Sequence, residues 1–291
     1  MTITLSPQKK GRIRTKLAKE LGIDRYDVFI SDNGEIEKVI VRNKIIDLSK
    51  FEFLKHVSFF VANTVVLNET LVKLPKYVEI IVVNVEGNRK INKIDLGKGL
   101  YYLRELEISN ANIKTLKDIE GIFGAIRLET LTLKSCNLKN LKEIDFFPVL
   151  RKLDISSNDI KSLKELIPCE KLEELNFNSN NIYLKEEMKN LKKIPNLKKI
   201  NFWRNYISSE GRRRTEKYGI FTLKETEDYL NNLKSFEELS DEEKEYISNK
   251  ELISELYKRL YGPKGSYDAT LKKKYEELVN RNRYLKRVVF D

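Results

Sequence analysis

The side chains best suited to catalysis are scarce in this chain of 291 residues, which contains one histidine, His56, and two cysteines, Cys136 and Cys169. A nucleophilic triad needs a histidine close to a serine or cysteine, and no motif around His56 indicates one. Two cysteines are too few for a zinc cluster, and no P-loop or Rossmann glycine pattern occurs. We therefore expect no catalytic residue, no metal and no cofactor, and we predict that the protein is not an enzyme.

The cysteines and the N-terminus bear on the cellular compartment. Cys136 and Cys169 are either buried free thiols in a reducing compartment, the commoner arrangement, or partners in a disulfide. The sequence has no apolar run of about 18 residues that would predict a membrane-spanning helix. Its first residues, MTITLSPQKKGRIR, lack the apolar segment of a signal peptide. We expect a cytoplasmic protein that does not bind membranes.

Cationic side chains are better candidates for function, and they are concentrated at the two ends of the chain. The net charge is +11, of which residues 1–21 contribute +5 and residues 261–291 contribute +4. Like-charged ends are suited to a polyanion such as nucleic acid or a ribonucleoprotein. Near the C-terminus the consecutive candidates for such a contact are Lys272, Lys273 and Lys274. The alternative is that these lysines form a solvated helix face.

A second cationic group lies near position 210. Arg204 is followed by the consecutive Arg212, Arg213 and Arg214, and guanidinium groups can hold phosphate or carboxylate groups bidentately. Trp203, the only tryptophan, precedes them, and tryptophan is enriched in binding hot spots. The alternatives are a solvated arginine loop and a tryptophan that packs beneath C-terminal helices.

A repeated pattern must position these residues. The sequence L-x-x-L-x-L-x-x-N-x-L occurs, with substitutions, from positions 103, 128, 150, 172 and 197. Each L-x-L centre predicts a short strand with alternate side chains buried. The asparagine, which is Asn158, Asn180 or Asn205, turns the chain and satisfies backbone groups that no strand pairs. Cys136 and Ala111 replace it in two repeats, and two degenerate repeats without it begin at 54 and 78.

This pattern resembles the leucine-rich repeat family, and the 22-residue units resemble its short intracellular type. The resemblance implies an α/β fold, a right-handed leucine-rich-repeat solenoid, and implies binding of a partner rather than catalysis. The composition is rich in Lys, Glu and Ile and has a single glutamine, Gln8. Such a balance is typical of hyperthermophiles, so we expect a thermophilic archaeal source.

The predicted strands define a surface. The third, fifth and seventh positions of each repeat should point away from the core, because side chains alternate along a strand. Near the N-terminus this places Phe60, Ile80 and Val82 in an apolar patch, which marks an interface unless the N-terminal cap covers it. The last repeat presents Lys199, Asn201 and Trp203. Between these ends the face mixes charges and threonines, and it lacks the basic stripe that tracks a phosphate backbone.

Other elements should cover the ends of the repeats, which we assign to residues 51–207. Residues 12–21 predict a helix, and alternating apolar runs around Asp32-Asn33-Gly34 predict a β-hairpin. Together they predict a cap over residues 1–50. Residues 208–291 predict a helical extension, with helices over roughly 241–260 and 268–286.

Two capping boxes predict where helices of this extension begin. Thr222 with Glu225, and Ser240 with Glu243, fit the pattern S/T-x-x-E. An extension of about 80 residues is longer than a cap requires, so it is a candidate for partner binding or self-association.

These features predict a non-enzymatic binding protein. We favour a factor associated with the ribosome or another ribonucleoprotein, in which the basic ends contact RNA and the near-neutral solenoid contacts protein. One alternative is a protein–protein adaptor or regulator without RNA contact. Another is a self-associating protein that forms a homodimer through its C-terminal helices.

Overall fold

In a computed structural model of the chain, the described residues are 5–51, 54–61, 67–68, 71, 73–86, 91–209, 214–215, 217–233, 238–261 and 269–290. Side chains are described over the same ranges except at 258, 260, 261, 269 and 287–290. The chain forms two compact units. The first contains residues 1–208 and 214–227, and the second contains residues 209–213 and 228–291.

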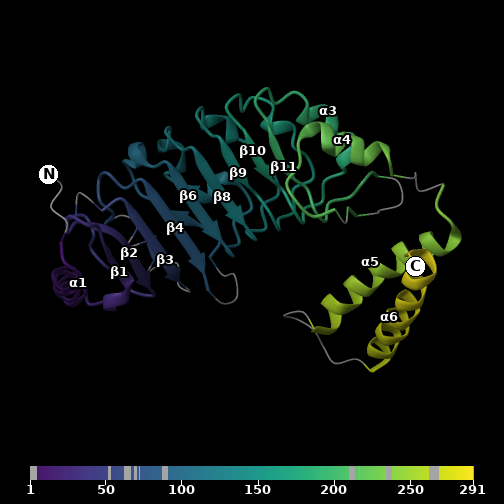
Figure 1. The fold of residues 1–291 in the computed structure, drawn as a ribbon, viewed down its shortest axis with the longest axis horizontal. Helices are drawn as coiled ribbons and strands as arrows, with labels where there is room; N and C mark the ends of the chain where they lie inside the picture. The colour runs from purple at the N-terminus through teal and green to yellow at the C-terminus, as the bar shows by residue number, and fades with distance from the viewer. Residues whose placement is uncertain are drawn as a thin grey trace. The chain divides into compact units, whose positions relative to one another are not determined.

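A curved, mostly parallel sheet forms the centre of the first unit (Figure 1). Its described strands lie in the order β1-β2-β3-β4-β6-β8-β9-β10-β11, and only β1 and β2 pair antiparallel. The strand bounds are Val28–Ile30 (β1), Ile36–Arg42 (β2), His56–Val61 (β3), Ile80–Val85 (β4), Glu105–Ser109 (β6), Thr130–Lys134 (β8), Lys152–Asp154 (β9), Glu174–Asn176 (β10) and Lys199–Asn201 (β11).

Alternation along each strand builds the core. In β6 and β8 the side chains of Leu106, Ile108 and Leu131 are fully buried, whereas Glu105 is partly exposed. Leu106 lies opposite Leu131 in register, so apolar side chains stack from repeat to repeat. Burial of one such side chain stabilises the fold by about 1.5–3 kcal/mol. The predicted register is confirmed, and it includes the two degenerate repeats, which supply β3 and β4.

Buried asparagines connect three of the repeats to the repeat before. Asn158 donates from Nδ2 to the carbonyl of Leu133 at 2.6 Å and accepts at Oδ1 from the N–H of Leu138 at 2.9 Å. Asn180 and Asn205 make equivalent bonds one and two repeats later. The role predicted for the asparagines is confirmed: they satisfy backbone groups that no strand pairs.

A threonine makes the equivalent contact at the end of the stack. Thr215 is buried, and its hydroxyl donates to the carbonyl of Phe202 at 3.1 Å. In the preceding repeat, Nδ2 of Asn205 donates to the carbonyl of Phe177 at 2.8 Å. Thr215 therefore makes the bond to the last strand that the asparagine of one further repeat would make.

A residue in the left-handed backbone region follows each repeat strand from β6 onward. These residues are Asn110, Ser135, Ser157, Ser179 and Arg204, with φ of 64°, 54°, 57°, 55° and 60°. The left-handed region costs an L residue roughly 1–2 kcal/mol, and asparagine tolerates it best. Arg204 is the one long side chain in this set.

Short elements return the chain from one strand to the next. Two of them, β5 (Ile94–Asp95) and β7 (Ile119–Glu120), pair in parallel as a second small sheet. α3 (Leu184–Leu191) forms the return arm before β11. Described 3-10 helices in these return segments are Leu100–Tyr102, Leu116–Asp118, Ile122–Gly124, Ile144–Phe146 and Lys164–Leu166, and a further one, Arg25–Asp27, joins α1 to β1.

The N-terminal cap contains the predicted helix and hairpin. α1 spans Pro7–Leu21 and packs Ala18 against Val28 and Ile30 of β1. The helix begins five residues earlier than its apolar spacing predicted, because Ser6 caps it and Pro7 occupies its first turn. The hairpin at Asp32-Asn33-Gly34 is confirmed by the antiparallel pairing of β1 with β2.

Three described helices follow the repeats: α4 (Leu223–Asn231), α5 (Asp241–Tyr261) and α6 (Ala269–Phe290). Both predicted capping boxes are present. The N–H of Glu225 donates to the hydroxyl of Thr222 at 3.2 Å, and the N–H of Glu243 donates to the hydroxyl of Ser240 at 3.2 Å. In the second unit α5 and α6 pair with each other, and an ion pair of 2.7 Å joins Glu245 to Arg281.

Candidate binding surface

One face of the parallel sheet carries two columns of side chains that run from repeat to repeat. Neighbouring strands lie about 4.8 Å apart, so adjacent members of a column can contact one partner. The first column is Lys38, His56, Ile80, Glu105, Thr130, Lys152, Glu174 and Lys199. The second is Ile40, Ser58, Val82, Glu107, Thr132, Asp154, Asn176 and Asn201.

An apolar patch occupies the N-terminal part of this face. Phe60, Ile80 and Val82 lie on the adjacent strands β3 and β4, and each keeps intermediate exposure. The guanidinium of Arg42 lies 4.7 Å from the ring centroid of Phe60, so β2 covers part of the patch. Arg42 also pairs with Asp27 at 3.2 Å. The structure thus brings together the three apolar residues that the sequence singled out.

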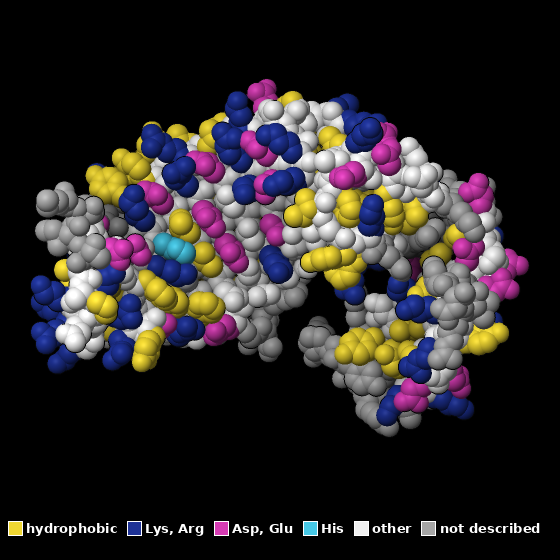
Figure 2. Space-filling model, viewed as in Figure 1, with side chains coloured by type: hydrophobic (Ala, Val, Ile, Leu, Met, Phe, Trp, Pro, Cys, Tyr) yellow, Lys and Arg dark blue, Asp and Glu magenta, His cyan; other side chains and the backbone are white. Residues whose placement is uncertain are grey.

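The histidine beside this patch is uncharged at neutral pH. Nε2 of His56 lies 3.1 Å from the hydroxyl of Ser58. Burial, together with the charge of Lys38, lowers the pKa of His56 from 6.5 to about 4. Figure 2 shows hydrophobic side chains next to this single histidine. His56 therefore adds a neutral polar group to the edge of the apolar patch.

Three positions expected to point outward are buried. Ser58, Ser109 and Ser156 have relative exposures of 2%, 7% and 5%. Serine is short, so longer neighbouring side chains cover it. The face consequently presents fewer hydroxyl groups than the sequence pattern predicted.

Two carboxylates adjoin the apolar patch. Glu105 lies opposite Ile80, and Glu107 lies opposite Val82, on β6. Glu107 accepts a hydrogen bond of 3.1 Å from the hydroxyl of Ser109. Neither carboxylate forms an ion pair with another described residue. Their charge is therefore available to a partner.

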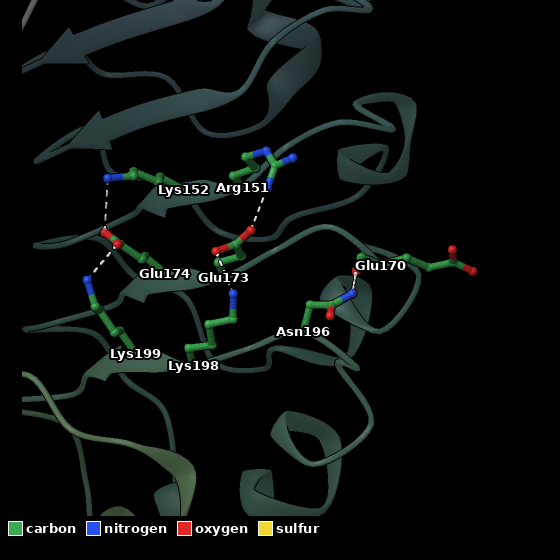
Figure 3. A network of polar contacts seen from close by, with 8 residues as sticks. All are labelled: Arg151, Lys152, Glu170, Glu173, Glu174, Asn196, Lys198 and Lys199. Atoms are coloured by element: carbon green, nitrogen blue, oxygen red, sulfur yellow. Dashed lines mark hydrogen bonds and ion pairs between the residues drawn. The ribbon is translucent and has the colours of Figure 1, made fainter.

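The opposite is true of the carboxylates near β10, which are neutralised from both sides (Figure 3). Glu174 lies 2.9 Å from Nζ of Lys199 and 3.4 Å from Nζ of Lys152. The hydrogen bond from Lys199, opposed by partial burial and aided by Lys152, lowers the pKa of Glu174. Glu173 bridges Arg151 and Lys198 in the same way. Lys199, a predicted partner-binding residue, is thus engaged within the protein.

The C-terminal end of the face is aromatic and cationic. The guanidinium of Arg204 lies 4.4 Å from the ring centroid of Trp203. The Tyr218 ring meets Trp203 edge-on, with centroids 5.4 Å apart and planes at 87°. Trp203 keeps intermediate exposure and Tyr218 is 73% exposed. The Trp203 ring therefore packs against Tyr218. Tyr218 belongs to the segment that follows the last repeat, described at residues 214–215 and 217–221 and called here the closing segment. Part of the Trp203 side chain stays exposed to solvent.

The closing segment is held to the last repeat by backbone and side-chain contacts. Phe221 forms an antiparallel bridge with Ile200 of β11. Arg214 donates from Nη1 to the carbonyl of Asn180 at 3.1 Å and from Nη2 to the hydroxyl of Tyr206 at 2.8 Å. Arg212 and Arg213, which the sequence also singled out, lie outside the described residues.

Two amide groups near this end have an unsatisfied atom. Oδ1 of Asn201, a predicted partner-binding residue, and Oδ1 of Asn178 are buried and have no hydrogen-bond partner among the described residues. A buried acceptor without a donor costs about 1–3 kcal/mol. The C-terminal end of the face therefore contains buried hydrogen-bond acceptors that no described donor satisfies.

The three consecutive lysines near the C-terminus belong to the second unit. Lys272 and Lys273 lie 4.0 Å from Glu276 and Glu277, one helical turn further along α6. Lys274 is exposed on the same helix. Such pairs contribute little energy but reduce the local positive charge.

Other chemistry is limited in the described part of the chain. Cys136 and Cys169 are buried free thiols, and burial, with a smaller effect of Asp145, raises the pKa of Cys169 to about 12. No described cluster of His, Cys, Asp and Glu could hold a metal ion. None of the described helices is long and apolar enough to span a membrane.

Sequence reasoning missed the residues outside the repeat pattern. Tyr218 lies in a segment without periodicity, so its position beside Trp203 follows only from the fold of residues 214–221. Arg42 lies in the cap predicted over residues 1–50, and its contact with Phe60 depends on the parallel pairing of β2 with β3. Glu105 and Glu107 were placed on the face, but their lack of ion partners is visible only in three dimensions.

Comparison with known proteins adds likenesses of low identity. No protein-family model and no curated protein matches the sequence. An internalin (inlF) from Listeria monocytogenes has 15% identity and a TM-score of 0.45 over 72% of this chain and 59% of its own. InlP from the same organism has 16% identity and a TM-score of 0.44 over 67% and 57%.

This chain thus spans less than two thirds of the length of either internalin. The fold class itself follows from the strand register, which repeats one strand and one return arm along the first unit. The chain folds as the α/β leucine-rich-repeat solenoid that its sequence predicts, with a helix and hairpin at the N-terminus and helices at the C-terminus.

Proposed function

We propose that this chain is a non-enzymatic binding protein that engages a protein partner through the N-terminal half of its sheet face. One observation carries the proposal: a partly exposed apolar patch, Phe60, Ile80 and Val82, adjoins two carboxylates that have no ion partner among the described residues, Glu105 and Glu107. Apolar area gives affinity, and unpaired charge beside it gives orientation and selectivity. The complementary partner segment carries aliphatic side chains next to a lysine or arginine.

A selection of a random peptide display library on the immobilised protein tests this proposal. We expect the enriched peptides to combine aliphatic and basic residues, and to lose binding to a Val82→Glu variant. Ile126→Glu is the matched control, because Ile126 is 46% exposed and lies in the loop before β8, off the sheet face. Peptides without this pattern, or peptides that bind the Val82→Glu variant equally well, would contradict the proposal.

A ribonucleoprotein partner is the second candidate, and α1 favours it. Four cationic side chains of this helix are exposed: Lys9, Arg12, Lys16 and Lys19. Exposed cations on one short element attract a polyanion at long range. In this proposal α1 contacts RNA of a particle such as the ribosome, while the sheet face contacts protein.

Sedimentation of the tagged protein through a sucrose gradient tests the second candidate. We expect co-migration with ribosomal particles that RNase or high salt abolishes, because phosphate contacts have a steep salt dependence. A variant with Lys9, Arg12, Lys16 and Lys19 changed to alanine should leave the particles. Migration as a free protein under all conditions would reject the ribonucleoprotein candidate, and the protein–protein adaptor would remain as the proposed function.

A further inference from the structure

We infer that the C-terminal end of the repeat stack carries a binding site for single-stranded nucleic acid, in which Trp203 and Tyr218 stack on bases and Arg204 holds phosphate. The site lies within the first unit, on β11 and the closing segment 214–221. It extends the ribonucleoprotein candidate to a defined surface, but it does not involve α1. Four observations support it.

The first observation is the backbone of Arg204. In four preceding repeats the left-handed position after the strand holds Asn110, Ser135, Ser157 or Ser179, and in the last repeat it holds Arg204 with φ of 60°. A long side chain gains nothing in stability there, because the left-handed region disfavours it more than asparagine. Departures from a local rule are concentrated at functional sites. The departure here places a guanidinium at the end of the sheet face.

The second observation is uncompensated charge. In earlier repeats, Arg104 directly before β6 pairs with Glu129 at 2.7 Å, and Arg151 directly before β9 pairs with Glu173. The guanidinium of Arg204 lies over the Trp203 ring, and its N–H groups have no acceptor among the described residues. Arg214 bonds neutral oxygens, including the carbonyl of Asn180, and no described carboxylate pairs with it. Two positive charges therefore remain at this end.

The third observation is the exposure of the rings. Tyr218 is 73% exposed although it already packs edge-on against Trp203, so one face of its ring is open to solvent. Ile220, which is 67% exposed, adds apolar surface next to it. Proteins that bind single strands stack bases on such rings and hold the backbone with nearby cations. A duplex hides its bases and offers only phosphates.

The fourth observation separates this end from the rest of the face. Near β10 each cation is neutralised by Glu173 or Glu174, and beside β4 the free charges are the carboxylates of Glu105 and Glu107. Around β11 and the closing segment, two arginines that no described carboxylate neutralises, Arg204 and Arg214, each lie next to an aromatic ring. An acidic peptide would use the arginines but would leave the rings unused, so nucleic acid accounts for more of the site.

The chain provides its own reporter for a test. Trp203 is the only tryptophan, so quenching of the tryptophan emission, excited selectively against the tyrosines, reports binding at this site. The probes are fluorescein-labelled 12-nucleotide single strands of RNA and of DNA with the same mixed sequence, and the matching DNA duplex. We expect saturable quenching and a rise in anisotropy with a single strand, and binding to the duplex at least tenfold weaker. Binding of either single strand supports the site and identifies the sugar it accepts.

Two variants and one control locate the site. Arg204→Ser places the residue of three earlier repeats at the same backbone position, so the fold should be kept and affinity should fall about tenfold through loss of a charge-assisted contact. Tyr218→Ala should lower affinity by about tenfold through loss of stacking. Arg104→Ser is the matched control, because Arg104 is paired with Glu129, and it should leave affinity within twofold.

Other results would overturn the inference. Absence of quenching, or equal weakening by Arg204→Ser and Arg104→Ser, would show that no defined site exists here. Displacement of the strand by a polyglutamate peptide of equal charge, with the same loss in the Arg204→Ser variant, would identify an acidic protein partner instead. Binding that is lost only when the α1 cations are removed would leave the ribonucleoprotein candidate intact and reject this site.

Discussion

The imidazole of His56 lies on β3 between Lys38 of β2 and Ile80 of β4, and this setting controls its protonation. Its pKa of about 4 lies below the ordinary value of 6.5. Between these two values the unfolded chain binds a proton that the folded chain does not bind. The free energy of unfolding therefore falls as the pH falls from 6.5 toward 4.

We predict that His56→Gln makes the protein less sensitive to acid in this window. The melting temperature of the wild type should fall more between pH 7 and pH 4.5 than that of the variant, because the variant has no imidazole to protonate on unfolding. Thermal scans at several pH values measure both. An equal fall in the two proteins would show that carboxylates alone determine the acid sensitivity.

The cysteines give a second prediction at the scale of single residues. Burial raises the pKa of Cys169 to about 12 and leaves Cys136 without exposed surface, so the reactive thiolate is scarce in the folded protein. We expect neither cysteine to react with a thiol reagent under native conditions, and both to react in denaturant. Mass spectrometry after timed labelling counts the modified thiols. Rapid labelling of the folded protein would mean that the repeats open locally.

In the repeats that contain it, the buried asparagine turn joins one repeat to the repeat before, so the stability of the stack depends on it. Asn180 bonds the buried carbonyls of Ile155 and Phe177, which also accept from Asn158 and Asn205. Its Oδ1 accepts from the buried N–H of Ile160, which has no other partner among the described residues. The ion pairs of Glu173 and Glu174 with cations of neighbouring repeats are different, because these side chains reach solvent. Exposed ion pairs contribute little to the free energy of unfolding. The two kinds of inter-repeat contact should therefore differ widely in their effect on stability.

We predict that Asn180→Ala lowers the free energy of unfolding by about 1–3 kcal/mol for each backbone group left unsatisfied. Leu175→Ala, which removes a core side chain of β10, should cost roughly 2–5 kcal/mol. Glu173→Gln breaks two exposed ion pairs and serves as the control, with little change expected. Urea unfolding followed by circular dichroism gives all three values. A Glu173→Gln effect as large as that of Asn180→Ala would contradict this ranking.

The elements also show what the sequence could predict. The L-x-x-L-x-L spacing predicted β6 to β11 and the face of each strand, because one buried side chain alternates with one outward side chain. Capping boxes predicted the starts of α4 and α5. The contacts that define the candidate sites were not predictable, since Arg42 with Phe60 and Tyr218 with Trp203 join segments outside the repeat pattern. No local rule links such pairs, and only the folded chain shows them.

For the whole molecule, the division into two units gives a test of where the repeat domain ends. Residues 214–227 belong to the first unit, and Phe221 packs on Phe202 with ring centroids 5.1 Å apart. The predicted boundary at residue 208 would remove this segment from the repeats. A chain cut there would expose the backbone of β11 and the apolar surface beneath Phe221.

We predict that residues 1–227 fold cooperatively with a melting temperature close to that of the full chain, whereas residues 1–208 melt lower and aggregate. Calorimetry and light scattering on the two truncated proteins measure both properties. The same light scattering tests self-association, because a homodimer formed through α5 and α6 should be lost in the 1–227 protein. Equal melting temperatures of the two truncated proteins would instead support the predicted end of the repeat domain near residue 208.

The direction of the asparagine bonds has a consequence for how the protein is made. Asn158, Asn180 and Asn205 each complete the backbone bonding of the repeat before their own, and Thr215 does so for the last repeat. During synthesis from the N-terminus, a repeat that has left the ribosome is therefore incomplete until the next one follows it. Folding should trail translation by one repeat along the stack, and it should finish only when Thr215 emerges.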